Sequence, residues 1–90
     1  MEISMMRDDD LLQRHTILCV DDDEEILQDL QRLLRHDGHD VLRATSGQAG
    51  LQLLAKHDVA LIISNQTMPG MLGSRFLEES REVAPDASRI

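Results

Sequence analysis

Short apolar stretches alternate along the chain with longer segments whose apolar residues recur at helical spacing. The first stretch runs from Thr16 to Val20, the second from Val41 to Ala44, and the third from Val59 to Ser64. Short, nearly continuous apolar runs are typical of strands that are buried on both faces of a parallel sheet. Strands that alternate with helices therefore predict an α/β fold with parallel strands and right-handed crossovers.

Three helices are predicted around these strands, over residues 24–36, 48–57 and 74–83. Acidic residues crowd the start of the first helix and basic residues its end, which suits the helix dipole. Gly38 is in the position of a C′ residue. Pro85 ends the last helix, because the residue before a proline avoids helical backbone angles. The side chains predicted to face inward from the first and last helices are Ile26, Leu27, Leu30, Leu33, Leu34, Phe76, Leu77 and Val83.

The three strands are predicted to lie in the spatial order 2-1-3, with one crossover on each side of the first strand. Open α/β sheets bind ligands at such a switch point, outside the carboxyl ends of the strands. The polar residues there are Asp21, Asp22 and Asp23 after the first strand and Asn65 after the third. We therefore expect one polar site built from these residues.

Carboxylates that crowd together need a proton or a cation to relieve their repulsion, and Mg²⁺ prefers carboxylate, carbonyl and water oxygens. A further carboxylate at position 65 could complete such a site and accept a phosphoryl group as an acyl phosphate. Asn65 changes this chemistry. Its amide oxygen can coordinate a metal only weakly, and its side chain cannot be a carboxylate nucleophile.

The composition excludes several classes of partner. The net charge of −8 argues against binding to nucleic-acid phosphates or to an anionic membrane surface. No apolar run approaches the length of a membrane span, and the acidic start lacks the features of a signal peptide. Cys19 is the single cysteine and lies in an apolar run, which predicts a buried thiol. We expect a cytoplasmic protein with a flexible acidic leader over residues 1–14 and one domain over residues 15–90.

Four stretches, ILCVDDDEEIL, RLLRHDGHDV, ATSGQAGLQLL and LIISNQTMPGM, occur in an order and at spacings that resemble one family. The chain resembles the amino-terminal part of a receiver domain of two-component response regulators, over residues 16–90. The resemblance implies a flavodoxin-like receiver fold. It also implies truncation before the fourth strand, because the chain stops at Ile90. The family's hydroxyl residue after strand four, its lysine after strand five and its usual output face would then be absent.

The resemblance assigns roles to four residues at the predicted site. Asp22 would be a direct Mg²⁺ ligand and Asp21 would act mainly through water, while the backbone carbonyl of Thr67 would complete the metal shell. Asn65 occupies the phosphoacceptor position and would be the remaining ligand, so Mg²⁺ binding is expected to be weakened. The implied partners are a cognate histidine kinase or phosphotransfer protein and an output domain in the parent protein.

Other interpretations stay open. Asp23 is best interpreted as a helix cap, the acidic cluster could serve solubility, and Asn65 could be a turn former. Asn65 could be an engineered block on phosphorylation or a natural divergence. The chain could instead be a receiver-like module for dimerisation or interaction that works without phosphate. A third possibility, a haloacid-dehalogenase-like phosphatase, rests weakly on the spacing of Asp21 and Asp23.

The strand order 2-1-3 also predicts that copies of the chain associate with one another. Strand three would be an open edge, and exposed edges of sheets invite pairing with other chains. We expect self-association through this edge and the bare face of the first helix, an exchange of elements between copies, or partial unfolding.

Overall fold

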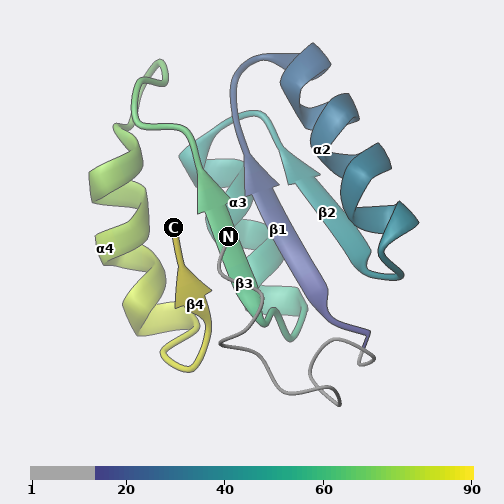
Figure 1. The fold of residues 1–90 in the computed structure, drawn as a ribbon. Coiled ribbons are helices and arrows are strands. Elements are labelled where there is room, and N and C mark those ends of the chain that lie inside the picture. Colours follow the sequence, from purple (N-terminus) through teal and green to yellow (C-terminus); the bar gives the residue numbers. More distant parts are fainter. Residues whose placement is uncertain (1–13) are drawn as a thin grey trace.

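The computed structural model describes residues 14–90, so the leader predicted over residues 1–14 lies, except for Arg14, outside the described residues. Strands and helices alternate along the described part, as predicted (Figure 1). None of its helices is long and apolar enough to cross a membrane. The elements are β1 (Thr16–Val20), α2 (Glu24–His36), β2 (Asp40–Ala44), α3 (Gly47–Lys56), β3 (Leu61–Ser64), α4 (Gly73–Val83) and β4 (Ser88–Arg89).

The strands form a parallel sheet in the order β2-β1-β3-β4. Helix α2 packs on one face of the sheet, and α3 and α4 pack on the other (Figure 1). The predicted α/β class and the predicted neighbours of β1 are confirmed. The switch point therefore lies between β1 and β3, whose carboxyl ends point to the same edge of the sheet.

The fourth strand corrects the prediction that the chain is truncated before it. Its backbone pairs with β3, because Ser88 N donates to Ala60 O at 2.9 Å and Ile90 N donates to Ile62 O at 2.9 Å. Two residues, one of them charged, carry no apolar periodicity from which a strand could be predicted. The edge of β3 that was expected to be open is therefore paired over this short length.

Arg89 explains why a charged residue lies in this strand. Its Nε donates to Ser80 Oγ at 2.9 Å, and its two terminal nitrogens donate to the carbonyl oxygens of Ala84 and Ala87. Ala84 is the C-cap residue of α4, where helix carbonyls lack partners within the helix, and Ala87 lies between this helix and β4. Arg89 thus caps α4 and attaches β4 to it.

The core has one part on each side of the sheet. On the α3 and α4 side, the largest fully buried side chains are Phe76, Leu18 and Ile62. On the α2 side, Ile17, Cys19 and Leu27 are buried, which confirms the prediction of a buried thiol. This second part is thinner, because among the described helices α2 alone covers that face.

Three side chains predicted to face inward are exposed instead. Ile26, Leu33 and Val83 have exposed fractions of 44%, 61% and 44%. Helix α2 packs over β1 and β2, so the side of the helix that carries Ile26 and Leu33 has no described element against it. Its periodicity correctly predicted an apolar face but could not show how much of that face is covered.

Candidate functional site at the carboxyl ends of β1 and β3

The sheet register brings the predicted site residues together. Val20 and Ser64 are paired in the register of β1 and β3, so Asp21 and Asn65 follow neighbouring strands at the same level. The backbone N–H of Asn65 donates to Val20 O at 2.9 Å, which continues the ladder by one residue. Asp21 N likewise donates to Ala44 O at 3.1 Å. The main chain on both sides of the site is therefore fixed by sheet hydrogen bonds.

The three aspartates after β1 have different environments. Asp21 is 7% exposed, and its Oδ1 accepts a hydrogen bond from Asp23 N at 2.9 Å. Asp23 Oδ1 accepts from Glu25 N at 2.9 Å and caps α2, as predicted. Asp22 is exposed, and its carboxylate lies beside the side-chain amide of Asn65. Asp21 and Asp22 are therefore the acids at the site, whereas Asp23 serves the helix.

Asn65 turns the nitrogen of its side-chain amide toward these groups. Its Nδ2 donates to the backbone oxygen of Thr67 at 2.9 Å and lies 3.5 Å from Oδ1 of Asp22. The amide oxygen and nitrogen project from opposite sides of one planar group. The oxygen that was expected to be a metal ligand therefore points away from Asp22 and from the carbonyl of Thr67.

This arrangement does not fit Mg²⁺ as it stands. Mg²⁺ takes oxygen ligands, and position 65 presents N–H groups between two of the oxygens assigned to it. Over residues 14–90, no group of three or more His, Cys, Asp or Glu side chains is arranged to hold a metal ion. The predicted cluster of Asp21, Asp22, Asn65 and Thr67 is assembled, but with its central amide turned the opposite way.

Gln66 is a residue of the site region that sequence reasoning missed. Its Oε1 accepts from Ser74 N at 3.0 Å and its Nε2 donates to Ser74 Oγ at 3.3 Å. Leu72, the N-cap residue of α4, makes no side-chain cap hydrogen bond, so Gln66 caps the helix from outside. A cap eight residues away has no recognisable spacing, which is why the sequence did not show it.

The loop after β3 is also packed tightly on the start of α4. Gly73 N donates to Gln66 O at 2.8 Å, and a Cβ at position 73 would lie 2.1 Å from the backbone oxygen of Asn65. Any larger residue would push the helix away from the site. The end of β3 and the start of α4 are therefore in close backbone contact.

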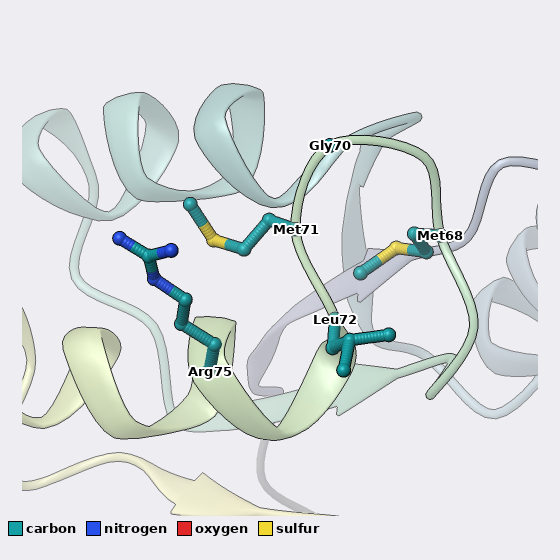
Figure 2. A pocket seen from close by; sticks show the side chains of 5 residues that line it. All are labelled: Met68, Gly70, Met71, Leu72 and Arg75. Atoms are coloured by element: carbon teal, nitrogen blue, oxygen red, sulfur yellow. The ribbon is translucent and has the colours of Figure 1, made fainter.

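An open hollow of about 340 Å³ lies beside this loop and is lined by Met68, Gly70, Met71, Leu72 and Arg75. Figure 2 shows the side chains of Met71 and Arg75 reaching the same side of it, one from the loop and one from α4. Met68 is 4% exposed and belongs to the core, and Gly70 has a φ of +83°. Met68 and Gly70 therefore shape the loop, one by packing into the core and the other by its backbone angle.

Two of the four histidines pack against each other beside the starts of β1 and β2. His15 and His39 are half-buried, and their rings stack with centroids 5.6 Å apart. The backbone N–H of His15 donates to Nδ1 of His39 at 3.2 Å. The contact arises because β1 and β2 run side by side, which brings residues distant in sequence together. His36 and His57 are exposed.

Comparisons with known proteins agree on one family. The model of the response regulator receiver domain matches residues 17–90. The chain is 37% identical over 75 residues to the hydrogenase transcriptional regulatory protein HoxA of Cupriavidus necator, an alignment that covers 83% of this chain and 15% of HoxA. The chain thus spans a small part of that relative.

Solved structures give the same result. The signal receiver domain of an HD domain-containing protein from Pseudomonas fluorescens superposes with a TM-score of 0.79 and 38% identity, over 84% of this chain and 56% of that one. The response regulator TrrA from Thermotoga maritima, solved in complex with Mg²⁺-BeF, superposes with a TM-score of 0.78 and 29% identity, over 83% of this chain and 65% of that one. The fold described above is therefore that of receiver domains.

Proposed function

Because the chain belongs to the response regulator receiver domain family, we propose that it is a signalling module whose position 65 does not accept a phosphoryl group. The observation that carries this proposal is the amide of Asn65 at the end of β3. An amide has no anionic oxygen to attack phosphorus, so the acyl phosphate that a carboxylate would form cannot arise. The domain would then be a receiver that is not phosphorylated at position 65.

We also propose that any Mg²⁺ affinity is weakened relative to a chain with aspartate at position 65. Asp21, Asp22 and the carbonyl of Thr67 supply oxygens at the right end of the sheet. Asn65, however, places hydrogen-bond donors among them and contributes no charge. Mg²⁺ binding would require this side chain to turn over and to give up its hydrogen bond to Thr67.

The proposed setting follows from the family. Partners would be a cognate histidine kinase or phosphotransfer protein and an output domain in a longer parent protein, in the cytoplasm. The module itself would not be an enzyme. The small share of the transcriptional regulator HoxA that this chain matches supports a role as one part of a larger regulator.

A second candidate function is that of an interaction module that works without phosphate. The observation in its favour is a set of exposed apolar side chains, Ile26 and Leu33 on α2 and Ile90 beyond β4, with exposed fractions of 44%, 61% and 71%. Side chains of this kind favour association, because their burial removes apolar surface from water. Such a module would dimerise or hold a partner through the α2 side of the sheet.

The intact mass after incubation with Mg²⁺ and a small acyl-phosphate donor tests the first proposal. The variants to compare are the chain itself, Asn65→Asp, and Asn65→Ala as the matched control without any side-chain nucleophile. We expect one added phosphoryl group on Asn65→Asp alone. Phosphorylation of the unchanged chain would contradict the proposal. No phosphorylation of any variant would make the interaction module the better description.

A further inference from the structure

We propose that the side-chain amide of Asn65 takes the place of a cation at this site, as a hydrogen-bonded cross-link between the carboxyl ends of β1 and β3. The pocket would then hold its arrangement without a metal ion and respond little to one. This inference rests on the proposed function, since both concern position 65. It goes beyond that function in one respect: the arrangement of the receiver pocket would not depend on divalent cations.

The positions of the amide nitrogen and its acceptors carry the inference. Asn65 Nδ2 has two protons, and it faces two oxygens: that of Thr67 at 2.9 Å and Oδ1 of Asp22 at 3.5 Å. The first bond fixes the plane of the amide, and the second contact directs positive partial charge at a carboxylate. These are the oxygens that the family resemblance assigns to the metal. The amide thus makes the links, from β1 to β3 and to the loop, that a cation would make.

The opposite orientation of the amide is unfavourable by itself. It would turn Oδ1 of Asn65 toward the carbonyl of Thr67 and the carboxylate of Asp22, so that three oxygens would face one another without a donor. An aspartate at position 65 would face the same oxygens in either orientation, and it would add a third charge near Asp21 and Asp22. Like charges at this spacing need a counter-charge. On the same backbone, an aspartate at position 65 therefore needs a bound cation, whereas an asparagine does not.

The surrounding main chain cannot relieve this difference by moving. Asn65 is held to β1 through the hydrogen bond of its N–H to Val20 O, and its carbonyl oxygen lies against Gly73 at the start of α4. Asp21 is bonded to β2 through Ala44 O. The side chain at position 65 therefore determines whether the site is held by a cation or by an internal cross-link.

Thermal unfolding with a chelator and with excess Mg²⁺ tests the inference in the unchanged chain, Asn65→Asp and Asn65→Ala. With chelator, we expect the unchanged chain to have the highest Tm of the three, because only it has the cross-link. Mg²⁺ should raise the Tm of Asn65→Asp by several degrees and leave that of the unchanged chain almost unchanged, since a ligand stabilises only the state that binds it. An equal Mg²⁺ response in the two chains would overturn the inference. So would a Tm of Asn65→Ala in chelator that equals that of the unchanged chain.

The side-chain amide can also be observed directly, which covers the case in which Asn65→Ala does not fold. In a ¹⁵N-labelled sample of the unchanged chain, the Asn65 NH₂ protons should exchange slowly with solvent and keep their shifts when Mg²⁺ is added. Fast exchange, or large shifts at low Mg²⁺, would refute the cross-link.

The two proposals fail in distinguishable ways. If the unchanged chain binds Mg²⁺ as well as Asn65→Asp but is not phosphorylated, the cross-link and the weakened Mg²⁺ affinity are refuted, whereas the proposal that position 65 accepts no phosphoryl group stands. If Asn65→Asp gains Mg²⁺ stabilisation but no phosphoryl group, the cross-link stands and the interaction module replaces the proposed function.

Discussion

Cys19 shows how burial of a single residue fixes a chemical property of the molecule. Its side chain is fully buried on β1, and desolvation raises the pKa of the thiol from 9.0 to about 11. Burial disfavours the thiolate, which is the nucleophilic form. The native thiol should therefore be inert near neutral pH, and Cys19 has a structural role.

The raised pKa predicts a loss of stability in alkali. Above pH 9.0 the unfolded chain begins to release the thiol proton, whereas the folded chain keeps it until about pH 11. The unfolded state then binds fewer protons, so the free energy of unfolding falls as the pH rises through this window and is fully retained below it. The fall from this group should reach about 2 kcal/mol. Urea unfolding at several pH values between these limits measures it.

Cys19→Ala is the control for this titration. The variant should be less stable at every pH because it leaves a small cavity, but its free energy of unfolding should change less with pH. The chain has no tyrosine, and Lys56 is its only lysine, so few other side chains titrate in the same range. Identical slopes for the two proteins would show that the thiol does not contribute.

Local patterns predicted some residues of the site well and could not predict others. Asp23 was recognisable as a cap and Gly38 as a helix end, because each role depends on a few neighbouring residues; Gly38 has a φ of +90°. The meeting of Asp21 with Asn65 followed from the order of the strands. The direction of the Asn65 amide did not, because it depends on the carbonyl of Thr67 and the carboxylate of Asp22 in three dimensions.

Among the elements, α4 depends on a cap that comes from outside the helix. Gln66→Ala removes both hydrogen bonds to Ser74, which leaves the first turn of α4 without a side-chain cap. We expect a loss of about 1 kcal/mol in the free energy of unfolding. Faster hydrogen exchange should appear at the first amides of α4. Chemical denaturation and amide exchange measure the two effects.

Two further substitutions make the cap prediction specific. Gln66→Glu keeps an acceptor for Ser74 N and places a negative charge at a helix start, so most of the stability should remain. Gln52→Ala removes an exposed glutamine inside α3 and should have almost no effect. A loss in Gln52→Ala as large as that in Gln66→Ala would refute the cap.

The predicted elements match the structure best where both of their ends have local signatures. Helix α2 spans Glu24–His36, as predicted, between the cap at Asp23 and the left-handed Gly38. Strand β3 begins at Leu61, two residues later than predicted, because its start has no such marker. Strand β4 was missed, since its pairing depends on β3 and on Arg89 rather than on its own apolar pattern.

At the scale of the whole molecule, the two faces of the sheet are unequally covered. Helices α3 and α4 pack together on one face, whereas on the other face α2 is the one described helix (Figure 1). Leu61 and Ile63 of β3 are half-buried on that second face. Parallel sheets normally have both faces covered, so this face is left with partly exposed apolar side chains.

This imbalance predicts self-association that strengthens with salt. The net charge of −8 makes two copies repel each other, and salt screens that repulsion over about 10 Å at 0.1 M. The free energy gained by burying Ile26 and Leu33 between two copies depends little on this screening, because these side chains are uncharged. Sedimentation velocity at rising protein and salt concentration should therefore show a growing dimer fraction. The double variant Ile26→Gln, Leu33→Gln should stay monomeric under the same conditions.

Leu72→Gln is the control that distinguishes association through the α2 side from non-specific hydrophobic association. Leu72 is 53% exposed, but it lies at the start of α4 and lines the hollow beside the β3–α4 loop. Its substitution removes about as much exposed apolar surface as either single substitution on α2 would, so the dimer fraction should not change if the α2 side is the contact. An equal effect of Leu72→Gln would indicate non-specific association. A compact monomer with a sharp thermal transition at every salt concentration would show that one helix covers the α2 face of the sheet well enough.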